Sequence, residues 1–199
     1  MNDKAWSGWF FFDKPIGITS NFALQKIKRI FNNSKAGFVG TLDPLASGFL
    51  PVALGKATKI IPFIEKCDKR YLFTVRWGIK TETGDSEGKV IKEINIYPNK
   101  IDIVKALNKF IGNVEQFPHK YSSVKINGQR AYKLARKNMK FQLKKRQIKV
   151  NNFTLINNIS EKLASFFVDC SSGTYVRSLA ESLAESLGTL ATVVELRRI

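Results

Sequence analysis

The amino-acid sequence predicts an α+β fold with a mixed, largely antiparallel central sheet flanked by helices. Stretches rich in aromatic and β-branched residues alternate irregularly with stretches of helical periodicity, and short turns join several of the strand-like stretches. The chain has 199 residues, 44% of them hydrophobic, which suffices for one domain with a sizeable core. No repeat, low-complexity tract or linker interrupts it, so we expect a single domain over residues 1–199.

The first elements follow from apolar runs and the residues that end them. Residues 9–12 form a bulky apolar run that predicts a buried strand, and the Pro and Gly of 13–17 predict the turn after it. Thr19 or Ser20 can cap a helix that continues to about residue 31, because a hydroxyl oxygen can accept from a backbone N–H of the first turn. A second, short helix is predicted over 55–64.

The middle of the chain predicts a strand pair and a helix. Residues 69–78 are aromatic and β-branched, and a polar loop over 81–88 leads to a weakly alternating return strand over 90–94. Apolar positions over 101–111 recur at helical spacing, and Gly112 suits the position just past the end of that helix.

The last part of the chain predicts three strands and the most regular helix. Residues 148–156 and 163–170 have the composition of strands. Residues 176–187 have clean helical periodicity, closed by Gly188. A final strand is predicted over 193–199.

Net charge is the strongest compositional signal. Lys and Arg number 33 against 16 Asp and Glu, which gives +17 at pH 7. Such an excess favours a polyanionic partner, either nucleic acid or an anionic membrane surface. An AT-rich genome would also raise the Lys content and would account for part of the charge.

The basic residues concentrate in one segment, 120–149, which contains no Asp or Glu. Residues 130–140 can form a helix with Lys133, Lys137 and Lys140 on one face. Like charges at these spacings destabilise a helix on its own, so we expect an anion to offset them. The alternative is a solvated basic face.

The sequence lacks the usual signals for metal binding, secretion and membrane insertion. Cys67, Cys170 and His119 have no metal-ligand spacing, so we expect no zinc or other metal and two reduced thiols. We expect His119 to face the surface or an RNA rather than to be catalytic. No cleavable signal sequence or apolar run of about 20 residues is present, so a cytoplasmic location without membrane insertion is predicted.

A turn over residues 37–48 organises the chain. It combines three glycines with Asp43-Pro44, and Leu residues flank the carboxylate on both sides. Glycine and proline give this turn a defined backbone shape. Because the apolar neighbours indicate burial, the Asp43 carboxylate needs a cation. Arg177 lies in the first turn of a predicted helix, where a cation opposes the helix dipole and needs an anion, so Asp43 is its candidate partner.

Six motifs in order along nearly the whole chain resemble those of the bacterial tRNA pseudouridine-55 synthases of the TruB type. They lie at 13–20, 40–48, 68–71, 121–125 (followed by Gly128 and Tyr132), 172–177 and 196–198. The resemblance implies the pseudouridine synthase fold, with a catalytic cleft across the sheet. It also implies isomerisation of the T-loop uridine of tRNA, position 55, without metal or organic cofactor, by a monomer.

The resemblance also assigns roles. Asp43 would be the essential carboxylate, either as nucleophile or in abstracting a ribose proton. Tyr71 would stack on the target base and assist the late proton removal, and Arg177 would pair with Asp43. The residues implied to contact substrate, or to line its pocket, are Phe38, Tyr175, Leu196, Lys14, Lys125 and Lys133.

Two departures from the family pattern modify these expectations. Phe38 stands where the family usually has a His that helps to displace the target base, so we expect base flipping by stacking alone, with lower efficiency. Family members usually continue into a small C-terminal RNA-binding domain of the PUA type, whereas this sequence stops at Ile199, so a weaker grip on tRNA is expected.

Two other functions compete with the enzyme. The first is a non-catalytic tRNA-binding or tRNA-folding protein on the same scaffold, which would bind tRNA without forming pseudouridine. Retention of Asp43, Tyr71 and Arg177 together argues against it. The second is a basic membrane-surface protein, for which the sequence offers no amphipathic helix with a wide apolar face.

Overall fold

The computed structural model describes residues 6–199. Residues 1–5, at the start of the stretch where a targeting sequence would lie, are outside the described residues. The chain forms two compact units. The first contains the residues up to Leu72 together with Glu195–Ile199, and the second is Phe73–Val194. Strands β4 (Lys69–Trp77) and β12 (Ala191–Arg198) each contribute residues to both units.

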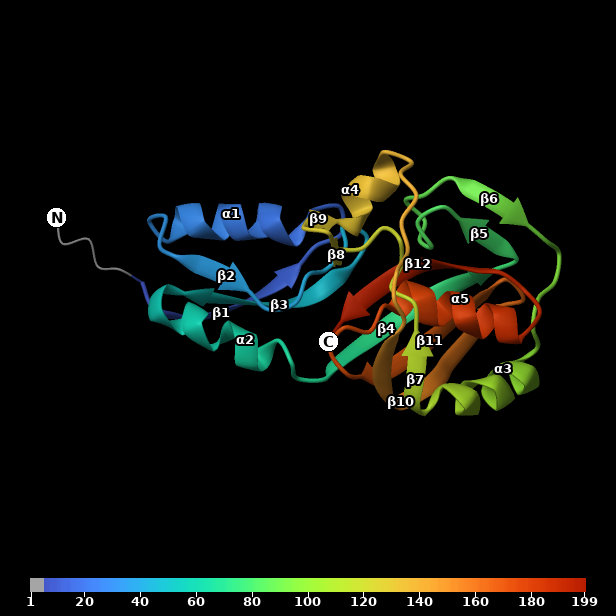
Figure 1. Ribbon diagram of the computed structural model, residues 1–199. Coiled ribbons are helices and arrows are strands. Elements are labelled where there is room, and N and C mark those ends of the chain that lie inside the picture. The colour runs from blue at the N-terminus through green and yellow to red at the C-terminus, as the bar shows by residue number, and fades with distance from the viewer. Residues whose placement is uncertain (1–5) are drawn as a thin grey trace. The chain divides into compact units, whose positions relative to one another are not determined.

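The first unit is a small sheet with one long helix on it (Figure 1). Strands β1 and β2 both pair antiparallel with β3, and the end of β12 pairs parallel with the start of β3, where Arg198 lies opposite Gly48. The elements lying wholly in this unit are β1 (Gly8–Lys14), α1 (Ser20–Ile30), β2 (Ala36–Phe38), β3 (Ser47–Leu54), the 3-10 helix η1 (Gly55–Ile60) and α2 (Ile61–Ile64).

Helix α1 begins where the sequence predicts, but Ile30 of its expected apolar face is 73% exposed. The Thr19 side chain accepts a hydrogen bond from the Phe22 N–H at 3.0 Å, which caps the helix. Its buried side chains Leu24 and Ile27 pack against Val52 of the sheet and its neighbours, which forms the apolar core of this unit.

Strand β1 differs from the expected buried strand because it has two faces. Successive side chains of a strand point to opposite sides, so a continuous aromatic run cannot be buried throughout when one side is open. Phe10 and Phe12 pack on the core, whereas Phe11 is 65% exposed and stacks on Phe49 with ring centroids 5.5 Å apart. Aromatic bulk predicted the strand correctly but not its exposed face.

The second unit carries the larger part of the sheet. Its strand order is β12-β4-β11-β10-β7, with antiparallel pairing of β10 with both β11 and β7. Its other elements are β5 (Ile79–Thr81), β6 (Val90–Glu93), α3 (Lys100–Leu107), η2 (Asn108–Phe110), β7 (Gly112–Gln116), β8 (Lys125–Ile126), β9 (Gln129–Arg130), α4 (Ala131–Arg136), β10 (Arg146–Ser160), β11 (Leu163–Cys170) and α5 (Val176–Ser186). Most of the described strand pairs are antiparallel and the pair of β12 with β3 is parallel, so the predicted α+β class with a mixed sheet is confirmed.

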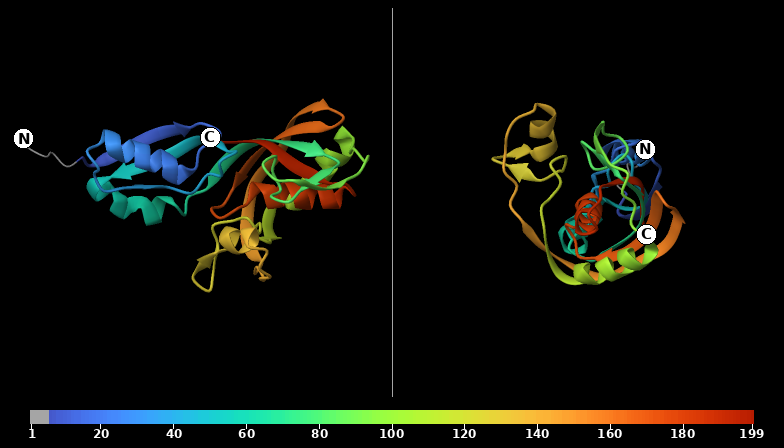
Figure 2. Two further views of the ribbon diagram at one scale, coloured as in Figure 1. Left: turned by 90° about the horizontal axis from the view of Figure 1, so that it is seen from above. Right: turned by 90° about the vertical axis from the view of Figure 1, so that its right-hand side faces the viewer.

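Aromatic rings fill the core of the second unit. Phe73 stacks on Phe166 at 5.4 Å between ring centroids, and Phe153 contacts both rings. Helix α5 adds Leu179 and Leu183, which are fully buried. The segment with β8, β9 and α4 extends away from the β10–β11 sheet of the same unit (Figure 2), and we call residues 121–140 the basic arm.

Gly48 is required where β3 meets β12. Its φ of +104° favours glycine, and a Cβ would lie 2.1 Å from the Arg198 carbonyl oxygen. Gly112 has a similar φ of +92° with open space around it. We therefore expect Gly48→Ala to lower the free energy of unfolding by about 1–3 kcal/mol more than Gly112→Ala, because only the former adds a clash to the backbone strain. Urea denaturation of both variants measures the difference, and equal losses would contradict this packing.

Candidate active site

The turn that carries Asp43 lies in the first unit between β2 and β3. Leu42 and Leu45 are buried and Asp43 is half-buried, as the flanking apolar residues predict. The Asp43 carbonyl accepts from the Ala46 N–H at 3.0 Å, which closes the turn behind the carboxylate. The backbone of this turn is therefore compact and carries a half-buried acidic side chain.

Residues from the start of the chain hold this turn from one side. The Ser20 hydroxyl donates to the Leu42 carbonyl at 3.0 Å and accepts from the Leu42 N–H at 2.8 Å. The Pro44 carbonyl accepts from the Gly17 N–H at 2.9 Å. These bonds hold the residues immediately before and after Asp43 in place. Moving either residue would break such a bond, and a buried polar group left without its partner costs about 1–3 kcal/mol.

Lys14 also supports the turn, and its contact with substrate stays a prediction. Its side chain is fully buried, and its ammonium group donates to the carbonyls of Pro15, Ile18 and Pro44 at 2.8, 2.7 and 3.4 Å. Sequence alone could not show that backbone carbonyls enclose this lysine.

Arg198 holds the turn from the other side. Its guanidinium donates to the carbonyls of Val39 and Gly40 at 3.1 Å each and to the carbonyl of Phe49 at 2.7 Å. Burial lowers the pKa of Arg198, and the interaction with Tyr71 opposes that shift.

Arg177 lies in the second unit, in the first turn of α5, where the sequence predicts it. Its guanidinium donates to the Thr83 carbonyl at 2.8 Å, to the Tyr121 carbonyl at 3.1 Å and to the Asp85 carboxylate at 3.2 Å. Asp85 therefore supplies an anion that the helix position requires, and sequence reasoning missed it because Asp85 lies in a polar loop typical of turns. The pairing of Arg177 with Asp43 stays a prediction.

Three other predicted pocket residues lie at defined positions. Tyr175 caps α5, and its backbone N–H and carbonyl bond reciprocally to the Gln116 amide at 2.8 and 3.0 Å. Leu196 is buried on β12. Phe38 ends β2 and packs against the core of the first unit, which occupies part of its ring surface. Their contacts with substrate stay predictions.

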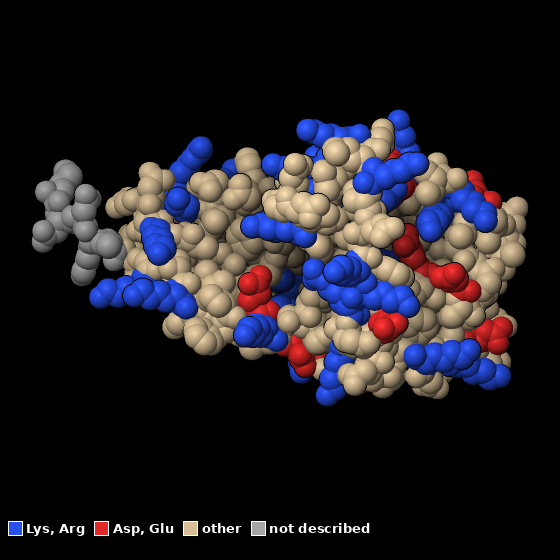
Figure 3. Space-filling view, viewed as in Figure 1, with Lys and Arg blue, Asp and Glu red and all other residues tan. Residues whose placement is uncertain are grey.

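The basic arm exposes most of its cations. Lys125 lies on β8 and Lys133 on α4, and both are exposed. Figure 3 shows Lys and Arg side chains spread over the viewed face, with several over the arm. Helix α4 is shorter than predicted: it ends at Arg136, and the Met139 N–H closes back onto the Leu134 carbonyl at 3.1 Å around a left-handed Asn138.

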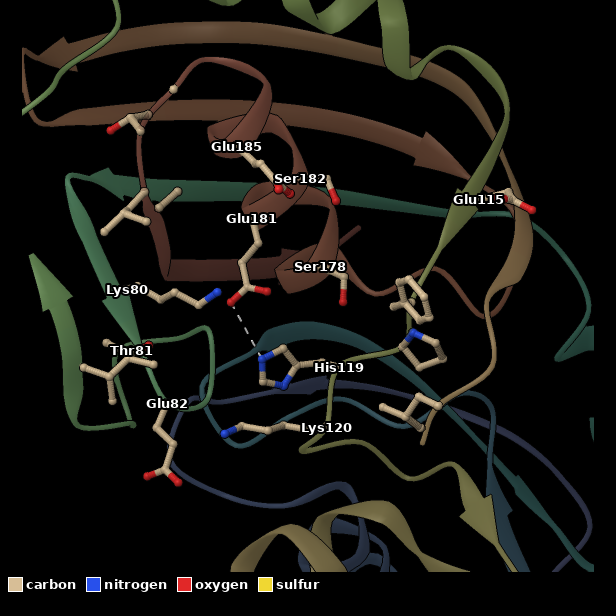
Figure 4. A pocket seen from close by; sticks show the side chains of 18 residues that line it. Lys80, Thr81, Glu82, Glu115, His119, Lys120, Ser178, Glu181, Ser182 and Glu185 are labelled. Carbon is tan, nitrogen blue, oxygen red and sulfur yellow. Dashed lines mark ion pairs between the residues drawn. The ribbon is translucent and has the colours of Figure 1, made fainter. Parts of the chain in front are cut away.

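A cavity of about 780 Å³ lies in the second unit beside α5 (Figure 4). None of Asp43, Tyr71 and Arg177 lines it. His119 is buried here, which corrects the expectation that it faces the surface or an RNA. Its Nδ1 accepts from the Tyr121 N–H at 3.2 Å, and its Nε2 lies 3.9 Å from the Glu181 carboxylate.

The contact of His119 with Glu181 is not an ion pair at neutral pH. Burial, reinforced by Arg177, Lys120 and Lys80, lowers the pKa of His119 from 6.5 to about 3. The imidazole is therefore neutral in the folded protein, and a histidine of ordinary pKa in the unfolded chain takes up a proton as the pH falls below 6.5.

This difference predicts a pH-dependent stability. Between pH 7 and pH 5 only the unfolded state gains the His119 proton, so the free energy of unfolding falls by about 2 kcal/mol from this group. Between pH 7 and pH 5, the free energy of unfolding of His119→Gln should fall by about 2 kcal/mol less than that of the unchanged protein. Urea unfolding at both pH values measures the two changes. Burial raises the pKa of Glu181, which favours the folded state as the pH falls. That carboxyl is present in both proteins, so its effect cancels in the comparison. Equal losses would show that His119 does not titrate in this way.

Within residues 6–199, no three or more His, Cys, Asp or Glu side chains gather in a way that could hold a metal ion. None of the described helices is both long and apolar enough to cross a membrane.

Three curated proteins similar to this chain carry the same name. A protein of Bradyrhizobium diazoefficiens named tRNA pseudouridine synthase B is 46% identical over 191 residues, which cover 96% of this chain and 55% of that protein. A protein of the same name from Wolbachia pipientis is 47% identical over 198 residues, with coverage of 96% and 55%. One from Ehrlichia ruminantium is 43% identical, with coverage of 96% and 65%. The chain thus spans between about half and two thirds of the length of these relatives.

Solved structures and a family model agree with this similarity. A Cbf5-Nop10-Gar1 complex matches with a TM-score of 0.74 and 30% identity, over 96% of this chain and 47% of the other. An H/ACA RNP bound to a substrate RNA containing 2′-deoxyuridine matches with a TM-score of 0.70 and 28% identity, over 96% and 46%. Residues 28–176 match the model of the TruB family pseudouridylate synthase, N-terminal domain. The chain therefore belongs to the TruB family of pseudouridylate synthases.

Proposed function

We propose that this chain is a tRNA pseudouridine synthase that isomerises the T-loop uridine at position 55. The observation that carries the proposal is the structure of the Asp43 turn. Its carboxylate is half-buried, and its backbone is hydrogen-bonded by Ser20 near the start of the chain and by Arg198 near the end. A turn of this construction suits an acid that must keep its position during a reaction. The names of the curated relatives specify tRNA as the substrate class.

The reaction is an isomerisation, so atoms balance without a co-reactant. The bond between ribose C1′ and uracil N1 breaks, the base turns, and C1′ bonds to C5. The C5 proton then leaves and N1 gains a proton. Asp43 acts either as the nucleophile at C1′ or by abstracting a ribose proton. Tyr71 stacks on the base and assists the removal of the C5 proton.

Arg177 is the proposed partner of Asp43. A guanidinium near a carboxylate favours its ionised form, which either role of Asp43 requires. Asp85 and the carbonyls of Thr83 and Tyr121 fix the direction of this guanidinium within the second unit, which supports a positioned rather than a mobile cation. Tyr175 and Leu196 wall the base pocket, and water exclusion there protects the detached base.

Binding to tRNA is proposed to depend on the basic arm. The target base must leave its stack, at a cost of a few kcal/mol, and phosphate contacts from Lys125 and Lys133 offset this cost. Phe38 stacks in the space that the flipped base leaves. We further propose that the chain acts as a monomer in the cytoplasm, without metal or organic cofactor.

The test is to incubate the protein with unmodified tRNA and to map pseudouridine along the product. We expect one pseudouridine, in the T-loop, and none in a transcript with cytidine at that position. Product at other positions would refute the substrate assignment. Tight tRNA binding without any product would favour the non-catalytic tRNA-binding alternative.

A further inference from the structure

Arg198 connects two of the proposed catalytic elements within the first unit. Its side chain is 3% exposed. Two of its nitrogens donate to Val39 and Gly40, which precede Asp43, and its Nε donates to Phe49, which follows the turn. One planar guanidinium therefore bonds to the backbone on both sides of the Asp43 turn.

The same residue reaches the strand that carries Tyr71. Burial lowers the pKa of Arg198 and Tyr71 opposes that shift, which indicates that the phenol lies beside the guanidinium. The next residue, Ile199, donates its N–H to the Arg70 carbonyl at 3.0 Å. The Tyr71 side chain and the adjacent backbone are thus both fixed to the end of β12.

The surrounding backbone leaves little room for another arrangement. A Cβ on Gly40 would lie 2.9 Å from the Arg198 Nη1, and a Cβ on Gly48 would lie 2.1 Å from the Arg198 carbonyl oxygen. Glycine at both positions allows the turn to approach Arg198 closely. Lysine would not reproduce these contacts, because one ammonium cannot place three separate donors on carbonyls on both sides of the turn as the planar guanidinium does.

We infer that Arg198 is a positioning residue, which holds Tyr71 and the Asp43 turn in one fixed register for isomerisation. The inference rests on the proposed function of Asp43 and Tyr71. Displacement of a reacting group by about 1 Å can lower a rate about 10²-fold while substrate binding is kept. Loss of the Arg198 fork should therefore affect turnover more than affinity.

The test compares Arg198→Lys with Arg197→Lys. Arg197 is the matched control: it is the neighbouring arginine of β12, and its exposed side chain pairs with Asp13 at 2.7 Å. We expect Arg198→Lys to lower kcat about 10²-fold with KM within about threefold, and Arg197→Lys to keep both within about twofold. Rates are measured well below each variant's unfolding temperature and per folded protein. An unchanged kcat in Arg198→Lys would overturn the inference.

A double-mutant cycle separates positioning from a general loss of stability. If Arg198 acts through Tyr71, Arg198→Lys should lower kcat much less in a Tyr71→Phe background than in the unchanged protein. Full additivity would overturn the coupling. Should Arg198→Lys not fold, Gly40→Ala disturbs the same contact from the backbone side, and the same fall in kcat with little change in KM is expected.

¹⁹F NMR of Tyr71 tests the role of Arg198 without an activity assay. The chain has five tyrosines, which fluorotyrosine labelling makes visible by ¹⁹F NMR, and Tyr71→Phe identifies the Tyr71 signal. Arg198→Lys should shift or broaden that signal, whereas Arg197→Lys should leave it in place. An inactive but folded wild-type protein would refute the proposed function alone, and an unmoved Tyr71 signal would refute the role of Arg198 alone.

Discussion

Asp43→Asn is expected to abolish pseudouridine formation while tRNA binding persists. The amide keeps the size of the side chain and the hydrogen bonds of the turn backbone, but it can neither attack C1′ nor take a proton. If Asp43 is a general base, the rate should fall about 10²–10⁴-fold. If it is the nucleophile, the loss should be about 10⁴-fold or more. Single-turnover assays with the variant in excess over tRNA measure the rate, and filter binding measures the affinity.

The control for this experiment is Asp13→Asn. Asp13 is exposed and pairs with Arg197 on the surface of the same unit, so its loss should leave the rate within about twofold. Undiminished turnover by Asp43→Asn would remove this carboxylate from the mechanism. Loss of tRNA affinity in parallel with activity would point instead to a role in binding.

Asp85→Ala is expected to produce the largest loss of stability in the second unit. Its carboxylate lies 3.2 Å from the Arg177 guanidinium, and the side chains are only 3% and 5% exposed. It also accepts from the Glu87 N–H at 3.1 Å and from the Thr83 hydroxyl. Removing one partner of a buried pair deprives a buried charge of its counter-ion, which costs about 3–5 kcal/mol. Urea unfolding gives the change in free energy.

Glu115→Ala is the matched comparison, because Glu115 and Lys145 are 3.0 Å apart but more than half exposed. An exposed pair at that distance contributes about 1 kcal/mol or less. Losses of similar size in the two variants would mean that burial of the Arg177 pair has no energetic consequence. If Arg177 also orients Asp43, Asp85→Ala should lower turnover even where the protein stays folded.

The sequence predicted most elements because their signals are local. Apolar spacing over 176–187 indicated α5, and the cap at Thr19 indicated the start of α1, since both depend only on neighbouring residues. The motif around Asp43 located the turn and its buried leucines for the same reason.

The supports of the site depend on contacts between distant residues and were missed. Asp85 lies in a Gly-Asp-Ser loop typical of an exposed turn, yet it is buried against Arg177, 92 positions further along the chain. Backbone carbonyls enclose Lys14 and Arg198, and nothing in the sequence indicated these contacts. Carbonyl groups carry no side-chain signature, so a sequence cannot show where they will converge on a cation.

The discontinuous first unit has a consequence for how the protein matures during synthesis. Residues up to Leu72 leave the ribosome early, but Glu195–Ile199, which complete this unit, are made only after all of residues 73–194. A nascent chain therefore carries Asp43 long before Arg198 exists to secure its loop. Incomplete chains released early would therefore lack an organised Asp43 turn, and the proposed activity should arise only late in translation.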